Sequence, residues 1–141
     1  MDFKLFGRFG YNVKVGSFLT SGKLYFTDYH HFAGNQTILA SQRNDGFQLL
    51  NYYNYSTAKS FVEVHLNHHF NGFIFNKIPL FRKLKWQEVI SLNHLTTTSN
   101  PSYMELGVGI EHIFKLFRID YFQSYLNTGY QMQGIVVGFG F

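Results

Sequence analysis

The last nine residues of the chain, Gln133 to Phe141, alternate between two kinds of side chain. A β-strand sends successive side chains to opposite faces, so one face of this strand is bulky and apolar and the other is nearly bare. This pattern is typical of the closing strand of an outer-membrane β-barrel, and the bulky set is predicted to be the C-terminal signal for barrel assembly. The bulky set consists of Ile135, Val137, Phe139 and Phe141. The other set consists of Gly134, Val136, Gly138 and Gly140.

Composition supports a strand-rich membrane protein of one domain. The chain has 141 residues, of which 20% are aromatic and only 14% are charged, whereas soluble domains carry about 25% charged residues. The mean hydropathy is −0.11, and no stretch approaches the ~18 apolar residues that a transmembrane helix needs. Alternating lipid-facing and lumen-facing residues would produce such an average.

Cysteine usage and charge exclude several classes of function. The chain has no cysteine, so it has no disulfide framework, thiolate metal site or cysteine nucleophile. The formal charge is +4, and the basic residues are dispersed apart from Arg82, Lys83 and Lys85. No basic stripe emerges, and we therefore expect no nucleic-acid partner.

Eight segments are predicted to be strands from their alternation or composition. The clearest is the fourth, where Val62, Val64 and Leu66 alternate with polar residues that share the other face. Residues 30–46 are predicted to form a long polar loop. The eight segments are residues 9–16, 23–29, 47–55, 62–69, 86–95, 104–111, 117–125 and the final strand after the Asn127–Gly129 turn.

One connection is amphipathic. If the final strand ends at the periplasmic side, strand parity places residues 30–46, 71–84 and 111–116 at the periplasm, and the other turns outside. Residues 71–84 interleave apolar and basic side chains, which suits a short turn at the inner headgroup boundary. Its basic residues could meet anionic lipid or a periplasmic partner, or be solvated. The predicted turn residues are Phe73, Lys77, Ile78, Pro79, Phe81, Arg82 and Lys83.

The N-terminus, Met-Asp-Phe-Lys-Leu-Phe-Gly-Arg, lacks a charged region followed by an apolar run. It is therefore not predicted to be a signal peptide. We expect the sequence to be a mature form, an expression product or a piece of a longer chain, and we favour the piece.

The central block resembles a known family. His68-His69-Phe70-Asn71-Gly72-Phe73, Asn76-Lys77-Ile78-Pro79-Leu80 and Arg82-Lys83-Leu84-Lys85 are similar to the C-terminal barrel region of uncharacterised Bacteroidota outer-membrane proteins, as are Gly34-Asn35-Gln36-Thr37 and Asn51-Tyr52-Tyr53. Those proteins carry an N-terminal carboxypeptidase-regulatory-like domain before the barrel. The resemblance covers most of residues 9–141 and implies an outer-membrane barrel, with BamA-like assembly and translocation barrels as a related class. The Val-Arg-Gly-Phe/Tyr loop motif of BamA-like proteins does not occur.

The histidines invite a metal-site hypothesis. Glu63, His65 and His69 share one face of the fourth predicted strand and are expected to form a polar cluster in the lumen. Residues i and i+4 on a strand lie about 13 Å apart, too far for imidazoles that must converge within about 2 Å of one ion. Only a cross-strand partner such as His94 could complete a site. We predict a hydrated network here, with no metal and no cofactor.

Enzymatic chemistry receives little support. The chain has no Gly-x-Ser-x-Gly motif, and no arrangement of Ser, His and acid stands out. Glu105, Glu111 and Asp120 are carboxylates on two neighbouring predicted strands. Arg118 is expected to pair with Glu105 as an ion pair inside the barrel. We predict no catalytic residues.

The sequence therefore predicts an all-β protein, an antiparallel up-and-down transmembrane barrel of about eight strands, either part of a larger barrel or a small closed one. The predicted role is non-enzymatic: a structural, assembly or transport component of the cell outer membrane. Expected partners are outer-membrane lipid, the barrel-assembly machinery and other envelope proteins. Three alternatives remain open: a self-contained eight-stranded structural or adhesion barrel, a barrel-borne hydrolase with Ser, His and acid side chains at one rim, and a soluble β-sandwich that binds a ligand. The last fails if the apolar face is too extensive to bury.

Overall fold

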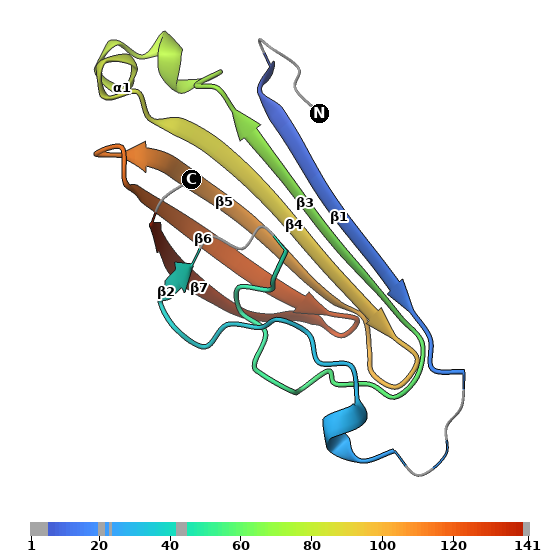
Figure 1. The fold of residues 1–141 in the computed structure, drawn as a ribbon. Coiled ribbons are helices and arrows are strands. Elements are labelled where there is room, and N and C mark those ends of the chain that lie inside the picture. The colour runs from blue at the N-terminus through green and yellow to red at the C-terminus, as the bar shows by residue number, and fades with distance from the viewer. Residues whose placement is uncertain (1–5, 20–21, 23, 42–44, 140–141) are drawn as a thin grey trace.

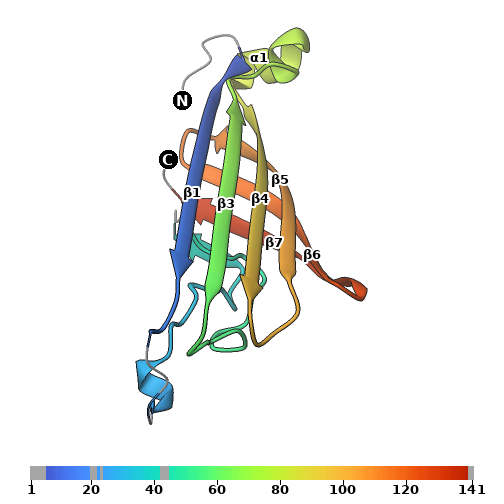
Figure 2. The same cartoon turned by 90° about the vertical axis from the view of Figure 1, so that its right-hand side faces the viewer.

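The computed structural model describes residues 6–19, 22, 24–41 and 45–139, which form one curved, open sheet (Figures 1 and 2). Six long strands run antiparallel to their neighbours, and the short strand β2 pairs parallel to β7 at the far edge. In sheet order the strands are β1 (Arg8–Gly16), β3 (Phe61–Phe70), β4 (Gln87–Thr97), β5 (Tyr103–Ile113), β6 (Phe117–Leu126), β7 (Gly129–Phe139) and β2 (Leu39–Ser41).

The two ends of the sheet differ in their connections. The β3–β4 connection, which holds the 3-10 turn η3 (Phe75–Lys77) and the helix α1 (Pro79–Leu84), lies at one end (Figure 1). The β4–β5 and β6–β7 turns lie at the other end, together with the start and finish of the long β1–β3 connection. That connection also contains the 3-10 turn η2 (Phe26–Asp28). No helix among the described residues is long and apolar enough to cross a membrane.

The strand register carries one polar row across four strands. His65 pairs with Asn93, Asn93 pairs with Glu105, and Glu105 pairs with Ser124. Directly opposed residues in an antiparallel sheet point to the same face. These side chains therefore line the concave face together, and all four residues are buried.

The concave face is covered by residues 30–41 and 45–57, which we call the inner segment. Its base is closed by paired backbone hydrogen bonds between His30 and Thr57. Apolar side chains from the inner segment and the sheet then form one buried cluster near the β4–β5 turn. The cluster consists of Phe32, Phe47 and Leu50 from the inner segment with Phe61, Leu95 and Tyr103 from the sheet.

The inner segment overturns two predicted strands. Residues 47–55 form no strand, because the amides of Phe47 and Asn35 bond to Ala33 and Leu50 within the segment itself. The described residues of 23–29 contain η2 instead, where the Asp28 carboxylate accepts a hydrogen bond from the Tyr25 amide. The predicted polar loop 30–46 contains β2 and returns along the sheet to the C-terminal half of β7. Its predicted placement at the same end as residues 71–84 is wrong, because the connection that contains it begins and ends at the end opposite to α1.

The other predicted strands are confirmed as β1, β3, β4, β5, β6 and β7, with boundaries shifted by a few residues. The all-β, antiparallel class is therefore correct. The described residues form six long strands and one short one in an open sheet, bounded by β1 and β2, rather than eight strands.

We expect Gly107→Ala to destabilise the fold. A Cβ at Gly107 would lie 2.3 Å from the ring of Phe122, a buried residue on the neighbouring strand. Overpacking of this kind typically costs about 1–3 kcal/mol. Gly10→Ala is the matched control, because its Cβ would meet only a backbone oxygen at 3.8 Å. Urea unfolding followed by circular dichroism should show a lower midpoint for Gly107→Ala alone; equal midpoints would contradict the packing described.

Candidate functional site

The candidate site is the polar concave face together with the inner segment that covers it. Strand alternation gives this face nearly every second residue of β3, β4, β5 and β6. Carboxylates, imidazoles, amides and hydroxyls are buried there, where unpaired polar groups are costly. The buried polar residues of these strands are Glu63, His65, Asn67, His69, Ser91, Asn93, Thr97, Glu105, Glu111, Asp120 and Ser124.

One chain of hydrogen bonds crosses the face from β3 to β5. Glu63 accepts from His65 at 2.7 Å and lies 3.5 Å from the Lys14 ammonium of β1. The other ring nitrogen of His65 lies 2.8 Å from Asn93 Oδ1, and Asn93 Nδ2 donates to Glu105 at 2.9 Å. Both nitrogens of His65 are thus hydrogen-bonded within the network.

Glu105 joins the sheet to the inner segment. Its fully buried carboxylate accepts from the backbone amides of Gln48 and Leu49, both at 2.8 Å, and from the Tyr103 hydroxyl at 2.7 Å. With Asn93, four donors converge on one carboxylate. Charge-assisted bonds of this type are stronger than neutral ones, so Glu105 fixes the inner segment on the concave face.

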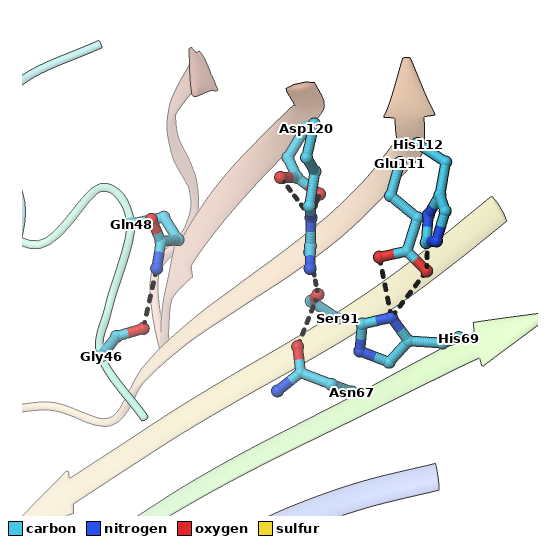
Figure 3. A network of polar contacts seen from close by, with 9 residues as sticks. Gly46, Gln48, Asn67, His69, Ser91, Glu111, His112 and Asp120 are labelled. Carbon is cyan, nitrogen blue, oxygen red and sulfur yellow. Dashed lines mark hydrogen bonds and ion pairs between the residues drawn. The ribbon is translucent and has the colours of Figure 1, made fainter. Parts of the chain in front are cut away.

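A second group of polar contacts lies nearer the α1 end (Figure 3). His69 Nδ1 lies 3.0 Å from both oxygens of Glu111. Arg118 Nε donates to Asp120 at 2.7 and 2.9 Å, while the Ser91 hydroxyl donates to Asn67 at 2.8 Å. The predicted ion pair between Arg118 and Glu105 is therefore wrong. Asp120, two residues after Arg118 on the same face of β6, binds the guanidinium instead.

The predicted lumen cluster is divided between these two groups. Glu63 and His65 are in contact, whereas His69 bonds to Glu111. His94 lies on the opposite face of β4, where its ring approaches Thr96. Among the residues that the structure describes, no group of three or more His, Asp and Glu side chains is placed to hold a metal ion.

One Ser–His contact bears on the hydrolase alternative. His31 Nδ1 lies 2.7 Å from the Ser56 hydroxyl at the base of the inner segment. The same ring packs against the aromatic rings of Phe26 and Tyr53. No described carboxylate is hydrogen-bonded to it, so the acid that would orient a catalytic histidine is not part of this contact.

Nearby, burial lowers the pKa of His30 below its usual value of 6.5.

The remaining predicted residues lie away from the concave face. Ile135, Val137 and Phe139 point outward from β7, and the Phe139 ring packs on Phe117 at 5.2 Å. Phe141 lies outside the described residues. The amphipathic turn is present as η3 and α1, with stacked rings of Phe75 and Phe81 4.7 Å apart.

Sequence reasoning missed the anchoring role of Glu105 and the partner role of Glu111. Both carboxylates were recognised, and both stand at inward positions of an alternating strand. Their partners, however, lie 57 residues away at Gln48 and 42 residues away at His69. A buried carboxylate without a donor is costly, so the sequence indicates that each of these carboxylates has a hydrogen-bond donor. It does not indicate which residue supplies that donor.

The fold and site define a class: an all-β protein with an antiparallel sheet whose covered face is polar. Residues 1–110 match the family of unknown function DUF5686, C-terminal domain. The chain therefore belongs to this family. Neither the curated proteins nor the solved structures contain a match to it.

We expect Glu105→Gln to loosen the inner segment. The glutamine side chain retains one acceptor oxygen, but its NH₂ group replaces the second oxygen and faces hydrogen-bond donors. The buried donors on that side lose their acceptor, and an unsatisfied buried group costs about 1–3 kcal/mol. Hydrogen exchange at the Gln48 and Leu49 amides should accelerate. Glu88→Gln is the matched control, because the backbone amides of Ile74 and Phe75 both donate to Glu88 Oε1, an oxygen that glutamine retains.

In the control, exchange should change little at residues 74–75 and stay unchanged at 48–49. If Glu105→Gln leaves residues 48–49 as protected as in the unaltered chain, then Glu105 does not anchor the inner segment.

Proposed function

We propose that this chain is a non-enzymatic component of an outer-membrane β-barrel with a structural, assembly or transport role in the bacterial envelope. The proposal places the convex face of the sheet against lipid and the concave face toward the barrel lumen. The barrel-assembly machinery would insert the protein. The resemblance noted for the central block further supports a Bacteroidota outer-membrane protein with an N-terminal carboxypeptidase-regulatory-like domain.

The single observation that carries the proposal is that the sheet is inverted relative to a water-soluble one. Antiparallel sheets in water bury their apolar face and expose their polar face. Here most of the covered face is polar, apart from the apolar cluster near the β4–β5 turn, and large apolar side chains are exposed on the outward face of the long strands. The outward set includes Tyr11, Val13, Val15, Val62, Ile90, Leu106, Val108, Ile119, Tyr121, Ile135 and Phe139.

The magnitude of this exposure favours lipid over water. Complete burial of one such side chain is worth about 1.5–3 kcal/mol. The eleven outward residues named above are roughly half exposed. In water, the free energy of burial that they would fail to gain is together comparable with the ~5–15 kcal/mol stability of a whole domain. Patches of this size mark a membrane or protein contact. The two outward histidines, His68 and His94, lie near strand ends, where the headgroup region would begin.

The open edges favour a larger barrel over a self-contained one. In lipid every backbone donor and acceptor needs a partner, so no free edge is tolerated. Among the described strands, β1 pairs with β3 and β7 pairs with β6 and β2. We therefore propose that further strands close the sheet between its two edges. The self-contained alternative would require β1 to pair with β7 directly.

The inner segment supports a lumen role. It lies on the concave face, held by Glu105, and Leu49 approaches Gly134 of β7 so closely that a Cβ there would lie 2.6 Å away. Within the proposed barrel this segment would fill part of the lumen as a plug. The α1 end would face the periplasm, since the longest connection leaves from the opposite end and outer-membrane barrels carry longer loops outside.

We expect Val108→Lys to destabilise the protein in a bilayer. Val108 lies at the middle of β5, points outward and is 56% exposed. A lysine at the bilayer midplane costs about 2–4 kcal/mol, whereas an exposed substitution on a soluble protein usually changes stability by less than about 0.5 kcal/mol. Urea unfolding of the protein reconstituted in vesicles measures the difference.

Two controls make the result specific. Val108→Leu keeps the position apolar, and Ser99→Lys adds the same charge in an exposed turn; both should unfold near the unaltered midpoint. Failure of Val108→Lys alone to insert would support the proposal as strongly as a lowered midpoint. A Val108→Lys protein as stable in vesicles as Val108→Leu would overturn it.

A further inference from the structure

Residues 71–86, which we call the α1 segment, are tied to the outward face of the sheet. The Glu88 carboxylate, which points outward from β4, accepts hydrogen bonds from the backbone amides of Ile74 and Phe75. Ile74 and Phe75 also line an apolar groove whose floor consists of outward residues of the sheet, including Ile90, Val108 and Ile119. The α1 segment is therefore continuous with the exposed apolar surface and lies at one end of it.

The exposed surface of the α1 segment is amphipathic. Apolar side chains remain 40–64% exposed although they adjoin the sheet: Phe73, Ile74, Ile78, Leu80 and Leu84. The segment also carries four basic residues and no acidic ones, namely Lys77, Arg82, Lys83 and Lys85. Lys77 lies over the Phe73 ring with its ammonium 4.8 Å from the centroid, so apolar and cationic groups alternate on one short stretch.

We propose that the α1 segment is a binding surface for anionic phospholipid headgroups in the leaflet at the α1 end of the barrel. This inference rests on the proposed membrane location. The apolar side chains would lie at the acyl boundary and the four cations at the phosphate level, as in other interfacial segments. A basic group near an anionic membrane surface contributes about 1 kcal/mol, equivalent to roughly a fivefold change in affinity.

The arrangement favours lipid over an acidic protein as the occupant. An acidic protein in the aqueous phase could bind these cations only if they lay on a surface that is set apart from the lipid-facing apolar residues. Here the cations are interleaved in sequence with apolar residues, and those residues are continuous with the outward face. The charge of the segment, +4, complements phosphate, and no acidic side chain within it offsets that charge.

Trp86 provides a local probe, because it is the single tryptophan of the chain. Its ring lies 5.6 Å from the Phe81 ring of α1, and it is only partly buried. The protein would be reconstituted in phosphatidylcholine vesicles containing either brominated phosphatidylglycerol or brominated phosphatidylcholine at equal mole fraction. Bromine quenches tryptophan fluorescence at short range, so the ratio of quenching reports which lipid gathers beside the α1 segment.

We expect brominated phosphatidylglycerol to quench Trp86 several-fold more effectively than brominated phosphatidylcholine, with the preference declining at high salt. Arg82→Gln/Lys83→Gln should abolish most of the preference. Lys83→Gln and Lys59→Gln form a matched pair that removes one lysine charge at opposite ends of the sheet. Only Lys83→Gln should reduce the preference.

The outcomes separate this inference from the proposed function. Equal quenching by the two brominated lipids would overturn the headgroup site while leaving the membrane location intact, and would redirect attention to a periplasmic protein. Quenching by neither lipid would also overturn the headgroup site, and the Val108→Lys measurement would then decide separately whether the strands contact lipid. A preference that Lys59→Gln reduces as much as Lys83→Gln would overturn the assignment to the α1 segment.

Discussion

The period-two alternation of the four adjoining strands β3, β4, β5 and β6, held in matched register, is the constraint on which the rest of the structure depends. Because directly opposed residues share a face, the pairing of His65 with Asn93 and of Asn93 with Glu105 sets the buried polar residues of β3, β4 and β5 on the concave side. A slip of one residue in any strand would send its polar set outward and its apolar set into the network. The inverted surface is thus a property of the whole register.

The buried network follows from that constraint and accounts for the inner segment. Polar groups on a covered face need partners, and the sheet alone does not supply enough donors for Glu105. Two backbone amides of the inner segment, at Gln48 and Leu49, complete its set. The segment is therefore bound to the sheet by polar contacts at Glu105 and by apolar contacts around Phe47, which is 1% exposed. Such a mixed attachment suits a segment that occupies a polar lumen.

Local alternation was enough to predict six strands, the amphipathic turn and the polar face containing Glu63 and His65, because each depends on neighbouring residues only. Residues 47–55 were mispredicted as a strand because Tyr and Phe favour strands, whereas their backbone groups bond within the inner segment and to Glu105. The partners of Glu105 and His69 depend on which strands pair and on how the inner segment folds back over the sheet. Neither can be predicted from the residues next to them in the sequence. The membrane location remains a proposal that the exposed apolar face supports.

The central claim is that the outward face contacts lipid, and the absence of cysteine allows a direct measurement. Single cysteines placed in turn from residue 103 to 113 along β5 would each carry a nitroxide spin label in reconstituted vesicles. The account predicts that labels at Met104, Leu106, Val108 and Ile110 collide readily with oxygen and poorly with a water-soluble nickel complex, with a period of two. Outward labels that collide with the nickel complex as freely as labels in the exposed β4–β5 turn would contradict it.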